Sequence, residues 1–228
     1  MSKVITFTNT RGLDFFPPKP AVKEVPDWYK NTPEYRGDQG KKIINNIHPQ
    51  TIKKCIPVFD AITSGYIIYT QTDVQIIYKN NSSEYTWGSQ NAIDFHPIDQ
   101  APLHPARNEA PYPKWNNSYA ITTPPGYSVL FTQPMHRESV FTIFDGIVDT
   151  DTYKAPVNFP FVLKDPKWEG IIPAGTPVAQ VIPFKRDSWK HKIGSDKELQ
   201  EQEKITKKLK TLLFNSYKRQ FWFKKEYR

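Results

Sequence analysis

The sequence predicts a mainly β protein, built as a sandwich or barrel, with a proline-rich arm before it and a helix after it. Aromatic residues make up 14% of the 228 residues and prolines number 21, whereas glycines number 10. This balance is typical of short strands joined by rigid loops. Short apolar runs that each end in a proline or glycine turn recur through the second half of the chain, which is the pattern of a sandwich or barrel. A chain of this length buries roughly 70% of its unfolded surface, so we expect a self-supporting core.

Residues 1–50 are predicted to form an extended arm. Prolines stand at positions 17, 18, 20, 26 and 33 in the first forty residues of this segment. Each proline opposes a helix interior or a central strand, because it fixes φ and lacks a backbone N–H. Trp28 and Tyr29 are the large apolar side chains that we expect to dock the arm onto a surface.

Residues 51–193 are predicted to form the β domain, with strands beginning from Thr51. The stretch "SGYIIYTQTDVQIIYKNNSSEYTWG" holds two β-rich runs and a polar "KNNSS" turn, which predicts a hairpin or meander. Residues 96–118 contain five prolines and are expected to form a long loop. Four further apolar runs follow, from "AITTPPGYSVLFTQP" to "WEGIIPAGTPVAQVIPF".

Residues 194–228 are predicted to form one amphipathic helix and a basic aromatic tail. Ser195 and Glu198 have the spacing of a capping box, and apolar residues from Ile205 to Leu213 recur at helical spacing. We expect this apolar stripe to pack on the β domain or on a neighbouring subunit rather than on a membrane. The sequence contains no run of about 18 apolar residues and no signal peptide, so no membrane contact is expected.

The net charge of +8 is concentrated at the C-terminal end. Residues 204–228 hold nine Lys or Arg and one Glu, so the remainder of the chain sums to zero. A globally basic surface for nucleic acid is therefore not supported, and any electrostatic partner should meet the C-terminus. The single cysteine, Cys55, is expected to be a small core residue of a protein kept in a reducing compartment or in a virion assembled there.

The tail "NSYKRQFWFKKEYR" interleaves cations with aromatic rings. Because three consecutive aromatic residues are costly to expose, Phe221, Trp222 and Phe223 are expected to contact a partner subunit or the protein's own sheet. The alternative is that cations and stacking rings bind single-stranded nucleic acid or an acidic protein groove.

The stretch "GIVDTDTYKAPVNFPFVL" carries the clearest candidate chemistry, with Asp149 and Asp151 one residue apart. Such carboxylates could serve catalysis, or they could satisfy backbone N–H groups at a hairpin tip, which is their commoner use. The five histidines show no spacing typical of a metal site, so we expect no resident metal or other cofactor.

Three segments carry a resemblance to the dUTPase and dCTP deaminase superfamily. They are "TTPPGYSVLFT", "GIVDTDTY" and "IIPAGTPVAQVIPF", and the earlier "DAITSGYIIYT" is similar to the first motif of that superfamily. The chain also resembles uncharacterised tailed-phage proteins in its "IKKCIPVFDAITSGY" and "VDTDTYKAPVNFPF" segments.

The resemblance implies a distorted jelly-roll or dUTPase-like β-barrel that forms a homotrimer with sites at subunit interfaces. In an enzyme of this kind Asp149 would be the catalytic base, Tyr153 would lie under the sugar and Gln180 near the base. Arg137 would be a displaced phosphate ligand, with Asp151 as a further ligand-binding residue. Magnesium would be a cofactor only for such an enzyme. The phage resemblance implies a virion or the host cytoplasm as location, with other virion proteins as possible partners.

Several departures from the superfamily pattern favour a non-catalytic use of the fold. The phosphate motif reads "TQPMHRES", in which Pro134 removes one N–H donor, and Ile67 and Ile68 stand where an acid is expected. The chain after Gly194 has no glycine for a lid, and "APVNFPFVL" offers only Asn158 where a deaminase needs a glutamate. The extra residue between Asp149 and Tyr153 would turn the ring to the opposite face of an extended strand or force a bulge. The sequence therefore predicts a structural or interaction protein, with a nucleotide pyrophosphatase as the alternative.

Overall fold

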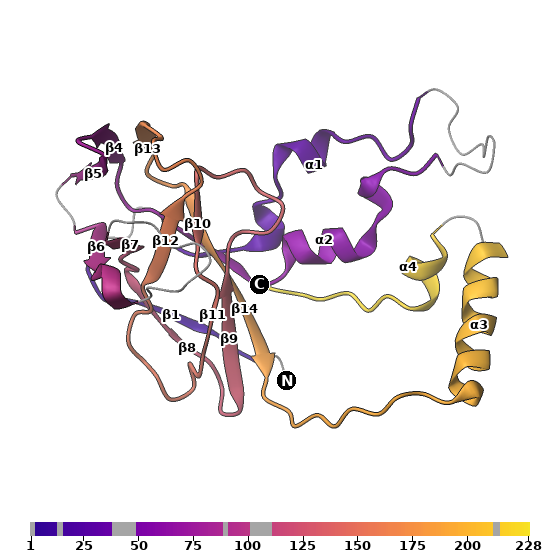
Figure 1. Ribbon diagram of the computed structural model, residues 1–228. Helices are drawn as coiled ribbons and strands as arrows, with labels where there is room; N and C mark the ends of the chain where they lie inside the picture. The colour runs from indigo at the N-terminus through magenta and orange to yellow at the C-terminus, as the bar shows by residue number, and fades with distance from the viewer. Residues whose placement is uncertain (1–2, 13–15, 38–48, 89–90, 101–110, 212–214) are drawn as a thin grey trace. The chain divides into compact units, whose positions relative to one another are not determined.

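The computed structural model describes residues 3–12, 16–37, 49–88, 91–100, 111–211 and 215–228 (Figure 1). Strands hold 34% of the residues and helices 21%, which confirms the mainly β prediction. Among the described residues no helix is long and apolar enough to cross a bilayer.

The chain divides into two compact units that do not follow the sequence order. The first, here called the β unit, comprises residues 1–24, 63–186 and 227–228. The second, here called the helical unit, comprises residues 25–62 and 187–226. From the sequence, we expected each segment to be one continuous stretch of the chain. Each observed unit instead combines early and late parts of the chain.

All strands of the described chain are paired antiparallel and form four open sheets. The five-stranded sheet has the order β11-β9-β14-β3-β2, and the others have the orders β10-β12-β7-β6, β13-β4-β5 and β1-β8. None of them closes into a barrel over the described residues. The strands are β1 (Thr6–Asn9), β2 (Lys19–Pro20), β3 (Tyr66–Tyr69), β4 (Val74–Lys79), β5 (Ser82–Trp87), β6 (Ile93–His96), β7 (Tyr112–Trp115), β8 (Tyr119–Thr122), β9 (Tyr127–Thr132), β10 (Phe141–Ile143), β11 (Gly146–Val148), β12 (Phe159–Leu163), β13 (Gly170–Ile172) and β14 (Pro177–Lys185).

The predicted hairpin after residue 65 is confirmed. Strands β4 and β5 pair from Val74 with Trp87 to Lys79 with Ser82, joined by Asn80 and Asn81. Both asparagines have positive φ, 54° and 61°, as the two central residues of a type I′ turn require. Asparagine tolerates this conformation better than other residues with a side chain, which explains why the polar turn folds tightly here.

Two expectations about the first half of the chain are corrected. Part of the expected extended arm is strand, because β1 pairs with β8 and β2 pairs with β3. The β region begins at β3 rather than at Thr51, since the intervening residues form the short 3-10 helix η2 (Ile52–Lys54) and the helix α2 (Ile56–Thr63). Pro57 lies in the first turn of α2, where the missing N–H has no intrahelical partner to lose.

The expected long loop at residues 96–118 is partly structured. It includes the end of β6, the short helix η3 (Ile98–Gln100) and all of β7. Residues 101–110 of that loop lie outside the described part of the chain.

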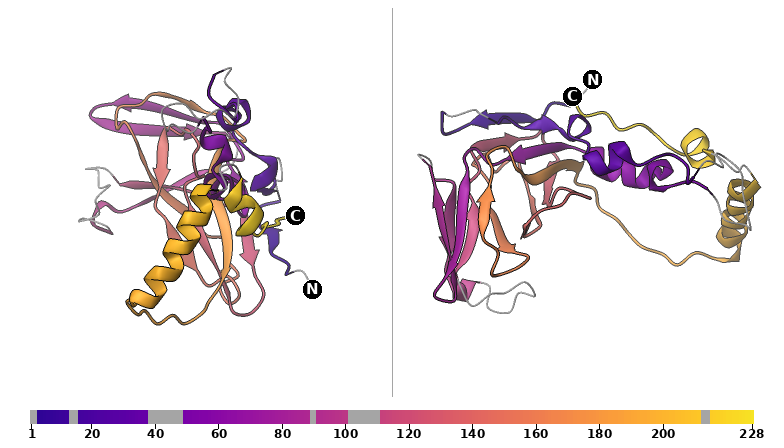
Figure 2. Two further views of the ribbon diagram at one scale, coloured as in Figure 1. Left: turned by 90° about the vertical axis from the view of Figure 1, so that its right-hand side faces the viewer. Right: turned by 90° about the horizontal axis from the view of Figure 1, so that it is seen from above.

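The predicted C-terminal helix is confirmed in its first part. Helix α3 spans Asp196–Thr211 and appears as one uninterrupted helix in two further views (Figure 2). Its capping box is present, because the Ser195 backbone N–H donates to Glu198 Oε2 at 2.9 Å. The prediction of a single helix is wrong beyond this point. Asn215 takes a left-handed φ of 60°, which no helix interior allows, and a separate helix α4 (Ser216–Gln220) follows. Leu212 and Leu213 lie outside the described residues.

The other helical elements are short. The helix α1 (Asp27–Asn31) buries Tyr29, whose hydroxyl donates to the Lys53 carbonyl at 3.2 Å within the helical unit. The 3-10 helix η1 (Ala21–Lys23) begins directly after β2.

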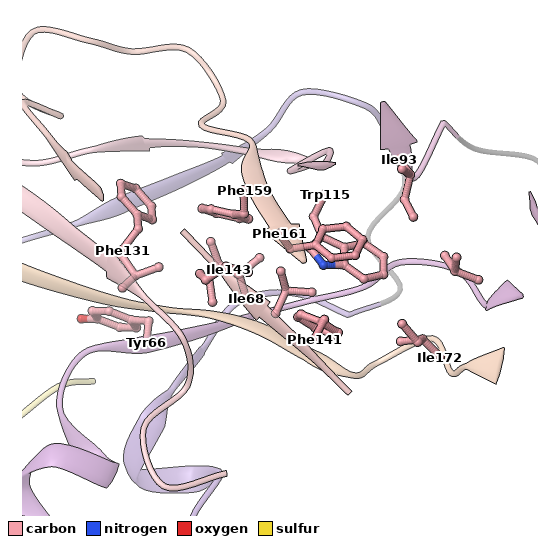
Figure 3. Close-up of a cluster of buried hydrophobic side chains, with 14 of the residues drawn as sticks. Tyr66, Ile68, Ile93, Trp115, Phe131, Phe141, Ile143, Phe159, Phe161 and Ile172 are labelled. Carbon is pink, nitrogen blue, oxygen red and sulfur yellow. The ribbon is translucent and has the colours of Figure 1, made fainter. Parts of the chain in front are cut away.

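The core of the β unit is aromatic and lies between its sheets (Figure 3). Phe131, Phe141 and Phe161 are almost completely buried, and the Trp115 ring stacks on Phe161 at 4.8 Å between centroids. Such ring pairs add to the free energy of burial. Trp115, Phe141 and Phe161 belong to one sheet, and Phe131 of the five-stranded sheet packs against that sheet at Phe159, with the ring centroids 5.5 Å apart.

The chain turns into β3 at a position that only glycine can occupy. Gly65 has a φ of +71°, and a Cβ placed on it would lie 1.9 Å from the Val181 carbonyl oxygen in β14. The Gly65 carbonyl also accepts the Ala21 N–H at 2.9 Å. This close approach lets β3 pair with β14, and that pairing sets where Gln180 lies.

Candidate functional site at the β11 turn

The two candidate carboxylates, Asp149 and Asp151, lie in a tight turn directly after β11. Thr152 and Tyr153 donate their backbone N–H groups to the Asp149 carbonyl, at 3.1 and 2.8 Å. Thr150 is buried and its hydroxyl lies 2.8 Å from that of Thr123. The turn is therefore fixed by its own backbone hydrogen bonds and by the buried Thr150.

Both carboxylates bind Arg186, the first residue after β14. Arg186 Nη1 lies 2.8 Å from Asp151 Oδ1 and 3.1 Å from Asp149 Oδ1, and Nη2 contacts Asp151 Oδ2. A guanidinium that presents two N–H groups to one carboxylate gives a directional ion pair. The Arg186 backbone N–H also donates to the Gly126 carbonyl at 2.9 Å, so the arginine is held at both ends.

Neighbouring donors complete the arrangement. Asp151 Oδ2 accepts the Gly126 N–H at 2.8 Å, and Asp149 Oδ1 accepts the Ser128 hydroxyl at 2.6 Å. The Asp151 side chain is 7% exposed, whereas that of Asp149 is 60% exposed. Asp151 is thus the structural member of the pair and Asp149 the one that solvent reaches.

These contacts hold both carboxyls as anions. The hydrogen bonds from Arg186 and Gly126 lower the pKa of Asp151 to about 2. The hydrogen bonds from Ser128 and Arg186 lower the pKa of Asp149 below its usual range. A general base works best with a pKa near the operating pH, so the observed environment shifts Asp149 away from that role.

Tyr153 lies apart from this ion pair, on an open hollow of about 430 Å³ that His96, Lys114 and Asn158 also line. Its side chain is half exposed. The stretch from Asp149 to Tyr153 is a turn and not an extended strand, so the expected effect of the extra residue on the direction of the ring does not apply. The backbone hydrogen bonds of this turn, rather than the alternation of side chains along a strand, set the position of Tyr153.

Gln180 is fully buried in β14. Its Oε1 accepts the Met135 N–H at 2.9 Å and its Nε2 donates to the Ser64 carbonyl at 2.7 Å. The amide thus joins the segment after β9 to the turn before β3. These contacts are those of a structural glutamine, whereas a residue that recognises a nucleobase must present its amide to a ligand.

Arg137 places its guanidinium beside Tyr69 and Glu24. Among the residues that the structure describes, its buried Nε and Nη2 atoms have no hydrogen-bond partner. Burial lowers the pKa of Arg137, and the charges of Tyr69 and Glu24 act in the opposite direction. Burial is also the main cause of the raised pKa of Tyr69. Buried donors without partners are rare, so this cluster is the second candidate site of the β unit.

The predicted site residues do not meet in one place within the chain. Ser128, which binds Asp149, pairs with Phe184 of β14, whereas Gln180 pairs with Thr132. Four residues of strand separate these two positions, or about 13 Å at the usual rise per residue. The aspartates of the β11 turn and Gln180 therefore lie at separate places along the β9 and β14 pair and do not form one site.

The aromatic residues of the tail have different environments. Trp222 is half buried, and its Nε1 donates to both oxygens of Asp60 at 3.0 and 2.9 Å. Phe221 is half buried and its ring lies 6.4 Å from that of Tyr217, whereas Phe223 is 83% exposed. Trp222 thus contacts its own chain, within the helical unit.

No three His, Cys, Asp or Glu side chains gather as a metal site requires, within the ranges that the structure describes. Two of the five histidines, His48 and His104, lie outside those ranges. Cys55 is exposed and not part of the core, so the expectation of a core cysteine is wrong.

Sequence reasoning missed Arg186 and Ser128. Arg186 follows its aspartate partners by more than thirty residues and no motif links them. One signal was available: "FKRD" places an arginine at the end of the last long apolar run.

No family model matches this chain, and no curated protein matches its sequence.

Proposed function

We propose that this chain is a non-catalytic structural and interaction protein. The observation that carries the proposal is the ion pair of Arg186 with Asp149 and Asp151. The carboxylates that would act on a substrate instead close the β11 turn against the end of β14. Their lowered pKa values suit a permanent ion pair better than proton transfer.

We further propose that the β unit is a dUTPase-like jelly-roll that lost its catalytic use. The order of the strands supports this idea: β9 follows the "PPG" turn, β11 precedes the two aspartates, and β14 contains the late "AQ" pair. The proposal includes a homotrimer, a phage origin, and a location in the virion or the host cytoplasm.

The partner surface that we propose includes the segment after β14. Residues 186–195 have no regular secondary structure, and Trp189 and Ile193 are 89% and 95% exposed there. Large apolar side chains at this exposure are costly in water, and contact with a second copy of the chain would cover them. Trp189 and Ile193 therefore replace Phe221 and Trp222 as the residues on which we place the oligomer contact.

Light scattering of the full chain tests this proposal. We expect a mass near three times 26.5 kDa. The double variant Trp189→Ser with Ile193→Ser should lower the mass, whereas Val4→Ser, at an exposed site of the β unit, should not. A strictly monomeric wild type would count against the proposal. Detection of the chain in purified particles of the virus that encodes it tests the proposed location.

Arg137 favours a second candidate function, a nucleotide-binding enzyme or regulator of the dUTPase class. Its buried Nε and Nη2 atoms have no partner within the described part of the chain, and a phosphate would need such donors. A thermal-shift screen of deoxynucleoside triphosphates with magnesium tests this alternative, because a ligand at 100 times its Kd stabilises by about 2.7 kcal/mol. A shift that Arg137→Met abolishes would support it, and the absence of any shift would reject it.

A further inference from the structure

The helical unit carries almost all of the net charge. Residues 25–62 and 187–226 contain 17 Lys or Arg and 10 Asp or Glu, so they account for +7 of the +8. The β unit is close to neutral. An anionic partner is therefore attracted to the helical unit.

A hollow of about 300 Å³ lies within this unit. It is lined by Lys54 and Cys55 before α2, by Asn215 and Tyr217 at α4, and by Lys218. Tyr217 is 43% exposed, so part of its side chain is accessible beside two cations. The Asn215 side chain also lines the hollow and makes no capping hydrogen bond to α4.

The positive charge at the hollow exceeds the negative charge. Lys54 Nζ lies 2.9 Å from Glu34 Oε2. Lys53 and Lys218 act on the same carboxyl, and the three lysines together lower the pKa of Glu34, with Lys54 as the largest cause. Lys53 does not line the hollow and donates to the Tyr29 and Lys30 carbonyls. Lys54 and Lys218 line it and act on the one carboxylate of Glu34, which leaves a local excess of about one positive charge for a second anion.

Asp60 holds the C-terminal tail, and the aromatic ring of Phe223 in that tail is exposed to solvent. Asp60 binds Trp222 through the indole N–H and binds Lys225 Nζ at 2.7 Å. Phe223 lies between these two anchors and is 83% exposed. Lys218 Nζ lies 5.7 Å from the centroid of the Trp222 ring, which connects this segment to the hollow.

We propose that the helical unit binds single-stranded nucleic acid, with a base stacked on Tyr217 in the hollow, phosphates paired with Lys54 and Lys218, and a neighbouring base on Phe223. A basic groove with accessible aromatic rings is the general basis of such binding, because every base has a face that stacks. An acidic protein surface would use the lysines but has no comparable use for exposed rings. A duplex keeps its bases stacked on one another and likewise leaves the rings unused.

Fluorescence anisotropy of the full chain with a labelled thymidine oligonucleotide of about 15 nucleotides tests the proposal. We expect binding at about 50 mM salt that weakens as the salt concentration rises, with a slope of about −0.7 per phosphate contact. Lys218→Glu should weaken binding by about tenfold and reduce the slope by about one contact. Lys79→Glu, which makes the same charge change at an exposed position of β4, is the matched control and should change affinity much less.

Two variants of Tyr217 test whether its aromatic ring stacks on a base. Tyr217→Ala should weaken binding about fivefold or more, whereas Tyr217→Phe should keep the wild-type affinity. Crosslinking of a bromouridine oligonucleotide followed by peptide mapping gives a second measurement, and we expect the label on the peptide that contains Tyr217.

Three outcomes would overturn the proposal. They are no binding of single strands at low salt, equal loss of affinity in Lys218→Glu and Lys79→Glu, and duplex bound as well as single strands. Binding of polyglutamate in preference to the oligonucleotide would assign the surface to an acidic protein instead.

Discussion

Arg186 binds Asp151 through two parallel contacts, Nη1 to Oδ1 at 2.8 Å and Nη2 to Oδ2. The same guanidinium also reaches Asp149, so one side chain neutralises both acids of the β11 turn. This relationship changes the interpretation of the two aspartates, because a carboxylate in a fixed ion pair holds structure more readily than it takes up a proton.

The ion pair predicts a specific acid sensitivity of the β unit. The pKa of Asp151 is about 2 in the folded chain, against about 4 when unfolded. A carboxyl whose pKa is lowered by folding contributes stability fully above its unfolded pKa, and this contribution is lost as the pH falls through the folded pKa. The contribution of Asp151 should therefore be complete well above about pH 4 and largely lost by about pH 2.

Urea unfolding of wild type and Asp151→Asn between pH 5 and pH 2 measures this effect. The wild type should be the more stable protein at pH 5, and the difference should shrink toward pH 2. Glu84→Gln, which removes an exposed carboxylate of β5 in the same unit, is the control and should show no comparable pH-dependent difference. A difference that does not depend on pH would show that the ion pair is absent in solution.

Gln180 is predicted to matter for stability and not for ligand recognition. Replacement by leucine leaves the Met135 N–H and the Ser64 carbonyl buried and unpaired. Each such group costs about 1–3 kcal/mol, so Gln180→Leu should lower the free energy of unfolding by about 3 kcal/mol or more. Gln75→Leu, at an exposed position of β4, is the control and should be nearly neutral. A stable Gln180→Leu protein with altered nucleotide binding would contradict the structural role.

Gly65 and Gly126 form a matched pair of glycines with positive φ, +71° and +82°. An added Cβ at Gly126 meets nothing within 4 Å, so Gly126→Ala should cost about 1–2 kcal/mol from backbone strain alone. At Gly65 the Cβ would collide with the Val181 backbone, so Gly65→Ala should cost several kcal/mol or prevent folding. Thermal unfolding of the two variants compares them directly. An equal loss of stability in the two variants would mean that Gly65 does not approach the Val181 backbone in β14 as closely as described.

Asp60 is predicted to hold the C-terminal tail within the helical unit. Hydrogen bonds to a charged group contribute about 1.5–3 kcal/mol, so Asp60→Ala should raise the population of the detached tail by about tenfold or more. Trypsin should then cleave faster after Lys224 and Lys225. Glu84→Ala, on an exposed strand position, should not change the cleavage rate. An unchanged rate in Asp60→Ala would place the anchor of the tail elsewhere.

Local patterns predicted much of the fold but little of the site. The "KNNSS" turn, the Ser195 capping box and the apolar runs at β9, β12 and β14 are encoded within a few residues, and the structure confirms them. Helix α2 was missed because "IPVFDAIT" resembles a strand in its apolar content, and its short length gives periodicity little weight.

The site depends on pairs that are distant in the sequence. Arg186 meets Asp149 only because β14 pairs with β9, and Trp222 meets Asp60 across more than 160 residues. No local pattern encodes such pairs. The sequence pointed to Asp149 and Asp151 but not to Arg186. Their ion pair with Arg186 is what favours a structural role over a catalytic one.

The central claim is that the aspartates of the β11 turn are structural. Pyrophosphate release from each deoxynucleoside triphosphate, with magnesium and with wild type, Asp149→Asn and Arg186→Ala, tests it most directly. We expect no release above the protein-free rate from any of the three. Release by the wild type that Asp149→Asn abolishes would contradict the claim.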